Sequence, residues 1–283
     1  MKRKYIITAD DYGLCPEVNE AIEKLSERGM LSTTNVLMNF GCDFTNAPLR
    51  SYSNYSVGLH WNVTTGRPLS DAEKIPSLVD QKGDFYSINE FRRRFRKGMI
   101  NKAELEIELQ NQFDEFYKWF GQPDYWNTHE NSSLYPLEYK VFEKIALRNH
   151  IKGTRNFQRV YLDYDLISGK RRLREWMVKS FVNVWFGVLA KKKFKMPEGR
   201  IVTFHNISKT DIERMKAGLS NTDKKSIEII IHPATCGDNP LFGNIAEDRV
   251  IEYEKYMSDE YMELFQNENA EIVSFSELRT MRK

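Results

Sequence analysis

Strand-like and helix-like segments alternate along most of this chain, and that alternation limits the possible folds more than any other feature. The segment "KYIITA" is apolar and reads as a buried strand. The segment after it is amphipathic, with apolar residues at helical spacing: Val18, Ala21, Ile22 and Leu25. Repeated strand-then-helix units favour parallel strands that are covered by helices. We therefore expect an α/β fold, either a barrel or a doubly wound sheet.

The same pattern continues to the end of the chain. Further strands are expected at "TTNVLMNF", "YSVGLHWNV", "PDYWNTHEN", "IKGTRN", "KSIEIIIHPA" and "AEIVSFSEL". Charged helices are expected around residues 105–120 and 136–150 and over residues 247–269. No internal repeat and no low-complexity linker interrupts these units, and 283 residues are enough for one large core. We expect a single domain over residues 1–283.

Residues 165–225 break the pattern. The stretch "KRRLREWMVKSFVNVWFGVLAKKKFKMPEG" is basic at both ends and aromatic in its middle. We expect an inserted helical hairpin that packs on the main fold. An alternative is that residues 170–195 contact an anionic membrane surface or a lipid-linked substrate, because basic flanks around Trp and Phe suit such an interface.

Composition argues against several classes of protein. A formal net charge of +2 gives no reason to expect a nucleic-acid partner. The three cysteines, Cys15, Cys42 and Cys236, have no CxxC spacing, so neither a disulfide framework nor a cysteine-zinc site is expected. No apolar run reaches about 18 residues, and the N-terminal "MKRKYIITADDYG" has charges where a signal peptide is apolar. We expect a reduced, cytoplasmic protein.

Polar residues suited to metal binding or acid–base chemistry follow several of the expected strands. They are Asp10 and Asp11, His60, His129 and His232. In parallel α/β folds the carboxyl ends of the strands open onto one face, where active sites lie. One aspartate and two histidines can hold a divalent cation with positions left open. Imidazole suits zinc, nickel, iron or cobalt, and a carboxylate widens the range toward magnesium or manganese.

Each of these signals has an ordinary explanation when it is taken alone. Adjacent aspartates often cap a turn or a helix, and a histidine at a strand end is often structural. The HExxH zinc motif fails here, because Ser133 stands where its second histidine would be. The shared location favours a metal site. One aspartate would bind the cation and the other would remain beside it as a base. The positive charge of the cation would stabilise both carboxylates and so offset their mutual repulsion.

At these residues the chain resembles the YdjC-like carbohydrate deacetylases, the family that includes chitooligosaccharide deacetylase. The matching segments occur in the family's order: "TADDYGLCPEVNEAI", "GMLSTTNVLMN", "VGLHWNVTTGRPL", "ELQNQFDEF", "PDYWNTHENSSLYP", "KGTRN" and "EIIIHPA". The resemblance implies a distorted TIM-like (β/α) barrel with an inserted helical segment. It is weakest over residues 156–225.

The resemblance also implies roles for individual residues. One divalent metal ion, with magnesium or zinc expected first, would be held by Asp11, His60 and His129. Asp10 would be the catalytic base and His232 the acid. Arg155 falls where the family carries an arginine beside the site, and we expect it to contact the substrate. The family commonly has Asp-Ser-His at the fourth strand, whereas this chain has Asn127-Thr128-His129.

The function that the resemblance implies is removal of an N-acetyl group from an amino sugar, or from its oligomer or conjugate, with a lipid-linked substrate as one alternative. Tyr12 and Trp61 lie near the expected site and could stack on a sugar ring or pack in the core. Two other functions stay open. One is another metallohydrolase, such as a phosphoesterase, on the same barrel. The other is a catalytically silent protein that binds sugar or lipid.

Overall fold

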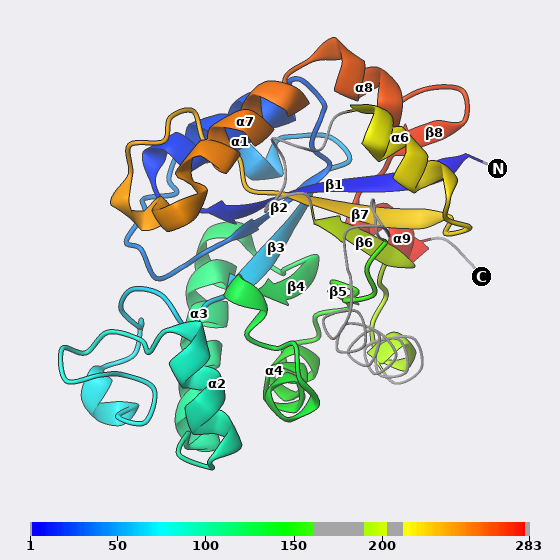
Figure 1. The fold of residues 1–283 in the computed structure, drawn as a ribbon. Coiled ribbons are helices and arrows are strands. Elements are labelled where there is room, and N and C mark those ends of the chain that lie inside the picture. The colour runs from blue at the N-terminus through cyan, green and yellow to red at the C-terminus, as the bar shows by residue number, and fades with distance from the viewer. Residues whose placement is uncertain (1, 161–189, 203–211, 281–283) are drawn as a thin grey trace, which may run out of the picture.

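The computed structural model describes residues 2–160, 190–202 and 212–280. Its centre is one parallel sheet whose strands follow the order β5-β4-β3-β2-β1-β7-β6, with β8 paired to the start of β1 (Figure 1). The strands are β1 Arg3–Tyr12, β2 Thr33–Val36, β3 Ser56–Trp61, β4 Tyr125–Thr128, β5 Gly153–Thr154, β6 Gly199–Val202, β7 Ser226–Ile231 and β8 Ala270–Ile272.

The two ends of this sheet come together. The backbone N–H of Val160, just after β5, donates to the carbonyl of Arg200 in β6 at 2.8 Å, and the N–H of Arg200 donates to the carbonyl of Gln158 at 2.8 Å. These bonds close the curved sheet into a distorted barrel. The expected α/β class and barrel fold are confirmed.

The helices lie outside the strands. They are α1 Pro16–Glu27, α2 Ile88–Arg96, α3 Lys102–Phe120, α4 Pro136–Arg148, α6 Ile212–Ser220, α7 Ala246–Tyr256, α8 Asp259–Phe265 and α9 Phe275–Thr280. In Figure 1, α1 and α7 lie together on one side of the sheet, and α3 and α4 lie on the other side. The apolar face of α3 is buried as its spacing predicts, including Leu105, Leu109 and Phe116.

Two expected elements have different bounds from those predicted. The helix expected over residues 247–269 is two helices, α7 and α8. The break falls at Ser258, whose Oγ caps α8 by accepting from the N–H of Tyr261. The strand expected at "AEIVSFSEL" ends at Ile272, and α9 begins at Phe275.

The segment expected as an insertion, residues 165–225, contains part of the barrel. Gly199–Val202 forms β6, which pairs with β7, and α6 covers residues 212–220. A short apolar strand followed by a helix continues the basic strand-then-helix pattern, so residues 199–202 and 212–220 belong to the barrel rather than to an insertion. Residues 161–189, which hold most of the proposed membrane-contacting stretch, lie outside the described residues.

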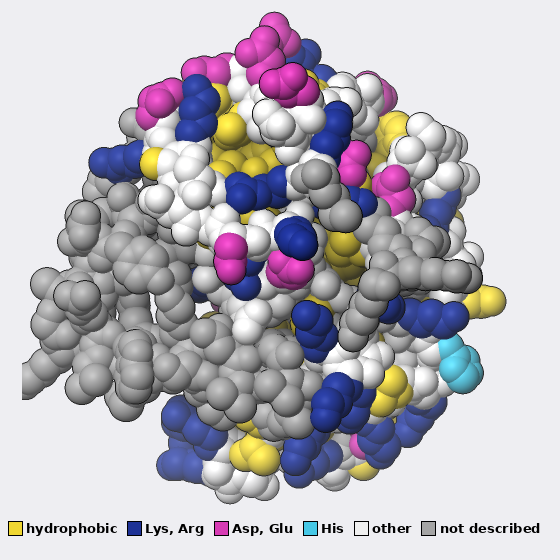
Figure 2. Space-filling model, turned by 90° about the vertical axis from the view of Figure 1, so that its right-hand side faces the viewer, with side chains coloured by type: hydrophobic (Ala, Val, Ile, Leu, Met, Phe, Trp, Pro, Cys, Tyr) yellow, Lys and Arg dark blue, Asp and Glu magenta, His cyan; other side chains and the backbone are white. Residues whose placement is uncertain are grey.

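The surface carries charge of both signs. Figure 2 shows the side where both termini lie in Figure 1, with acidic side chains gathered at the top and basic ones along the lower edge. This distribution fits the small formal net charge of +2. None of the helices that the structure describes combines the length and the apolarity needed to cross a bilayer.

Candidate metal centre

The adjacent aspartates lie at an irregularity in β1. Successive side chains on a strand normally point to opposite faces. Between Ala9 and Tyr12, however, the register of β1 against β2 shifts, and Asp11 has a positive φ of 76°. Such irregularities re-aim side chains, and aspartate tolerates a positive φ better than most residues do. As a result both Asp10 and Asp11 face the same site.

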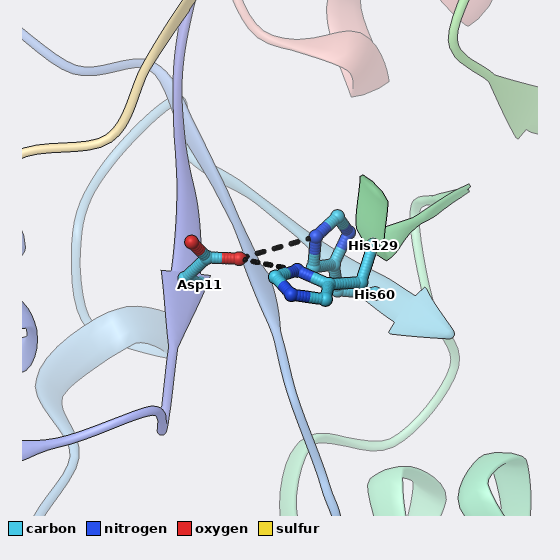
Figure 3. A group of neighbouring side chains, drawn as sticks. All are labelled: Asp11, His60 and His129. Carbon is cyan, nitrogen blue, oxygen red and sulfur yellow. Dashed lines mark hydrogen bonds and ion pairs between the residues drawn. The ribbon is translucent and has the colours of Figure 1, made fainter. Parts of the chain in front are cut away.

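Asp11, His60 and His129 converge on one point (Figure 3). Asp11 Oδ1 lies 3.0 Å from His129 Nδ1 and 3.3 Å from His60 Nε2. One possible ligand atom from each of the three residues falls within 4.8 Å of the others. One carboxylate oxygen and two imidazole nitrogens in this arrangement fit a divalent cation.

The remaining oxygen of Asp11 is occupied by an arginine from α7. Arg249 Nη2 donates to Asp11 Oδ2 at 2.6 Å, and both side chains are buried. Burial alone would raise the pKa of Asp11, but His129 and Arg249 hold that pKa well below its usual value. Burial lowers the pKa of His129, yet the carboxylate of Asp11 outweighs it and the net shift is upward. Asp11 is therefore a carboxylate with one oxygen, Oδ1, directed at the two imidazoles.

Asp10 lies beside this cluster in a network of its own. Arg155 donates to both of its oxygens at 2.7 Å, and Asn35 Nδ2 donates to Oδ1 at 2.6 Å. Arg155 also donates to Glu228 Oε1 of β7, from Nε at 3.0 Å and from Nη2 at 2.9 Å. Burial opposes ionisation of Asp10, but the guanidinium of Arg155 lowers its pKa below the usual value. Asp10 is thus ionised at neutral pH.

His232 follows β7 and faces Asp10. Its Nε2 lies 3.7 Å from Asp10 Oδ2, and its backbone N–H donates to Glu252 Oε2 at 2.5 Å. Burial lowers the pKa of His232 to about 4, more than the nearby carboxylates raise it. The imidazole of His232 is therefore neutral at neutral pH.

One cavity of about 520 Å³ is lined by the five side chains that the sequence had singled out: Asp10, Asp11, His60, His129 and His232. Arginines line it as well: Arg92, Arg155, Arg159, Arg200 and Arg249. Arg200 is buried, with Nη1 donating to Asn131 Oδ1 at 3.0 Å and its guanidinium over the ring of Phe157. Within the described part of the chain, Arg92, Arg159 and Arg200 form no ion pair with a carboxylate. The cavity is thus lined by three arginines besides the two that pair with Asp10 and Asp11.

Two of the expected substrate contacts lie elsewhere. Trp61 follows His60 directly, so strand alternation turns it to the opposite face, where its Nε1 donates to the carbonyl of Leu109 in α3 at 2.9 Å. Tyr12 stacks against Phe44 and its hydroxyl donates to Glu23. Both side chains are buried and neither lines the cavity, so each packs in the core.

The sequence pattern did not single out Arg249, Glu228 or Arg200. Arg249 lies on the charged helix α7. The sequence feature that could have pointed to it is its helical spacing to Glu252 and Tyr256, with which it forms the buried face of that helix. Glu228 is a lone acid within an isoleucine-rich buried strand, which is a signal that its charge must be paired. Arg200 lies on β6, a strand that the pattern left unassigned.

Fold and site together define a class: a parallel (β/α) barrel with a candidate single-metal centre at the carboxyl ends of its strands. The chain belongs to the YdjC-like protein family, whose model matches residues 4–267.

Curated relatives carry deacetylase names. A chitooligosaccharide deacetylase of Serratia marcescens is 31% identical over 148 residues, 52% of this chain and 56% of that protein. A carbohydrate deacetylase of Danio rerio is 28% identical over 54% of this chain and 50% of that protein. The chain thus spans about half the length of these two relatives. A carbohydrate deacetylase of Clostridium beijerinckii is 23% identical over 97% of this chain and 100% of that protein.

A solved structure confirms the fold. A protein of Enterococcus faecalis, described as a candidate cellobiose-phosphate cleavage protein, superposes with a TM-score of 0.77 at 21% identity, covering 98% of this chain and 99% of that one.

Proposed function

We propose that this protein is a metal-dependent hydrolase that removes the N-acetyl group from an amino sugar or from its oligomer or conjugate. One observation carries the proposal: Asp11 Oδ1, His60 Nε2 and His129 Nδ1 converge beside a cavity that Asp10 and His232 also line. The deacetylase names of the curated relatives support this choice of reaction.

Asp11, His60 and His129 would hold the cation, with magnesium and zinc as the first candidates. When bound, a divalent cation lowers the pKa of water to about 7 and polarises a carbonyl oxygen. The two imidazoles favour zinc over magnesium, which prefers oxygen ligands. Arg249 keeps Asp11 ionised and fixes the orientation of its carboxylate.

Asp10 and His232 would move the protons. Amide hydrolysis must take one proton from the attacking water and give one to the departing amine. Asp10 is a carboxylate and can accept the first proton. His232 is neutral and so must gain a proton before it can act as an acid. His232 Nε2 lies 3.7 Å from Asp10 Oδ2, which is longer than a hydrogen bond, so a proton would pass between them through a bridging water or after the two groups move closer.

A second candidate is hydrolysis of a phosphate ester, which Arg92, Arg159 and Arg200 favour because they offer positive charge to the cavity. Phosphorylated substrates separate the two reactions. Deacetylation releases a free amine and acetate, whereas ester hydrolysis releases inorganic phosphate.

The test of the proposed function is amine release from N-acetylglucosamine oligomers by protein loaded with zinc or magnesium. We expect turnover by the wild type, and its loss in Asp10→Asn with the cation retained. Asn19→Asp is a matched control, because Asn19 binds the backbone of Gly13 and does not line the cavity. A cation-loaded wild type that releases neither amine nor phosphate would favour a catalytically silent binding protein instead.

A further inference from the structure

We propose that Asn127 holds His60 in the tautomer that opposes cation binding, so that this chain binds its cation more weakly than it would with an aspartate at this position. The inference rests on the metal site of the proposed function. It goes beyond that function because it assigns Asn127 a role in setting the affinity.

The two ring nitrogens of His60 have different neighbours. Nε2 faces Asp11 Oδ1 at 3.3 Å, and Nδ1 lies 2.6 Å from the side-chain amide of Asn127, the residue paired with His60 in the register of β3 and β4. A neutral imidazole carries one N–H and one lone pair. A cation bound at Nε2 needs the lone pair there, and the proton must then lie on Nδ1.

The surroundings of Asn127 place that proton on the other nitrogen. With its amide oxygen turned away from His60, Asn127 accepts from Arg155 Nη1 at 2.9 Å, from Arg155 Nη2 at 3.0 Å and from Asn35 Nδ2 at 2.9 Å. Its amide nitrogen then donates to His60 Nδ1 at 2.6 Å. In this arrangement Nδ1 is an acceptor, and the proton of His60 is on Nε2, directed at Asp11.

The opposite orientation is unfavourable. Turning the amide so that its oxygen faces His60 Nδ1 places its NH₂ group against the N–H groups of Arg155 and Asn35. Asn127 is 1% exposed, so water cannot compensate for these opposed donors. A cation bound at Nε2 requires an N–H at Nδ1. The NH₂ group of Asn127 would then face either that N–H or the N–H groups of Arg155 and Asn35, depending on how the amide is turned.

A carboxylate at position 127 removes this conflict. Both of its oxygens accept, so it can take the Nδ1–H of His60 and the N–H groups of Arg155 and Asn35 together. Groups that orient a metal-binding histidine commonly change metal affinity by about 10–100-fold. We expect Asn127→Asp to bind zinc at least about tenfold more tightly than the wild type.

The experiment measures zinc affinity by competition with a chelator for the wild type, Asn127→Asp and Asn127→Ala. Asn131→Asp is the matched control, because it adds a carboxylate to the same cavity without the contact to His60. We expect the gain for Asn127→Asp to exceed that for Asn131→Asp clearly, and Asn127→Ala to bind no more weakly than the wild type.

Nitrogen NMR of the histidine side chains gives a readout that is independent of activity. In the metal-free wild type we expect His60 to carry its proton on Nε2. In the zinc-loaded protein, and in metal-free Asn127→Asp, we expect the proton on Nδ1. A proton on Nδ1 of the metal-free wild type would overturn the inference. So would weaker zinc binding by Asn127→Ala without a gain in Asn127→Asp. Failure of the wild type and all variants to bind zinc or magnesium would instead overturn the metal site itself.

Discussion

Replacing Arg155 by methionine should destabilise the fold severely, because this residue neutralises two buried carboxylates. Arg155 makes hydrogen bonds of 2.7–3.0 Å to Asp10 and Glu228. The exposed fractions of the three side chains are 3%, 4% and 0%. Methionine has a similar length but no charge, so both carboxylates would lose their cation in a site with little access to water. Breaking one buried pair costs about 3–5 kcal/mol, and two carboxylates depend on this guanidinium.

The assay is urea unfolding followed by circular dichroism at neutral pH, with chelator present so that cation binding does not contribute. We expect the free energy of unfolding to fall by at least about 3 kcal/mol. Arg93→Met is the matched control. Its partner Glu90 lies one turn away on the exposed face of α2, and solvent screens that pair, so a far smaller change is expected. A loss below about 1 kcal/mol in Arg155→Met would refute the view that this network depends on Arg155.

Two further predictions concern pH and packing. Burial lowers the pKa of His232 to about 4 from an ordinary value near 6.5. Between pH 6.5 and pH 4 this imidazole is therefore protonated more in the unfolded chain than in the folded one. The free energy of unfolding must then fall as the pH falls through that range. The loss of unfolding free energy that His232 causes reaches about 3 kcal/mol at the acid end of this range. In urea unfolding, the free energy of unfolding of metal-free His232→Gln should therefore depend less steeply on pH than that of the wild type. Equal slopes would contradict the burial argument. Gly58→Ala should lower the free energy of unfolding by about 1–3 kcal/mol, because a Cβ at this position would lie 2.3 Å from the ring of Tyr125, which stacks on Phe275. Gly237→Ala is the control, because φ there is not positive and a Cβ would meet its neighbours only at 3.5 Å or more; an equal loss there would contradict the packing explanation.

The sequence predicted the parts of the site that follow from strand order alone. Asp10, Asp11, His60, His129 and His232 lie at or just after the carboxyl ends of their strands, and parallel strands bring those ends to one face. That Asp10 and Asp11 both face the site depends in addition on the irregularity in β1. Arg155 was expected from the family resemblance, and it lies between Asp10 and Glu228.

What the sequence did not predict depends on local geometry or on distant segments. The stacking role considered for Trp61 ignored the side-chain alternation of β3, which turns it toward α3. Arg249 reaches Asp11 from α7, 238 positions along the chain, and helix periodicity shows only that it is on a buried stripe. β6 is short and lies in a stretch of unusual composition, so its place next to β7 became visible only through backbone pairing.

The metal dependence of amine release tests the proposed function most directly. The measurement counts divalent ions per chain in wild type, His60→Ala and His129→Ala, and follows deacetylation of N-acetylglucosamine oligomers after chelation and after zinc or magnesium is restored. We expect about one ion per wild-type chain, loss of that ion in both variants, and turnover that disappears on chelation and returns with the cation. Amine release at the wild-type rate by metal-free protein, or by both histidine variants, would contradict it.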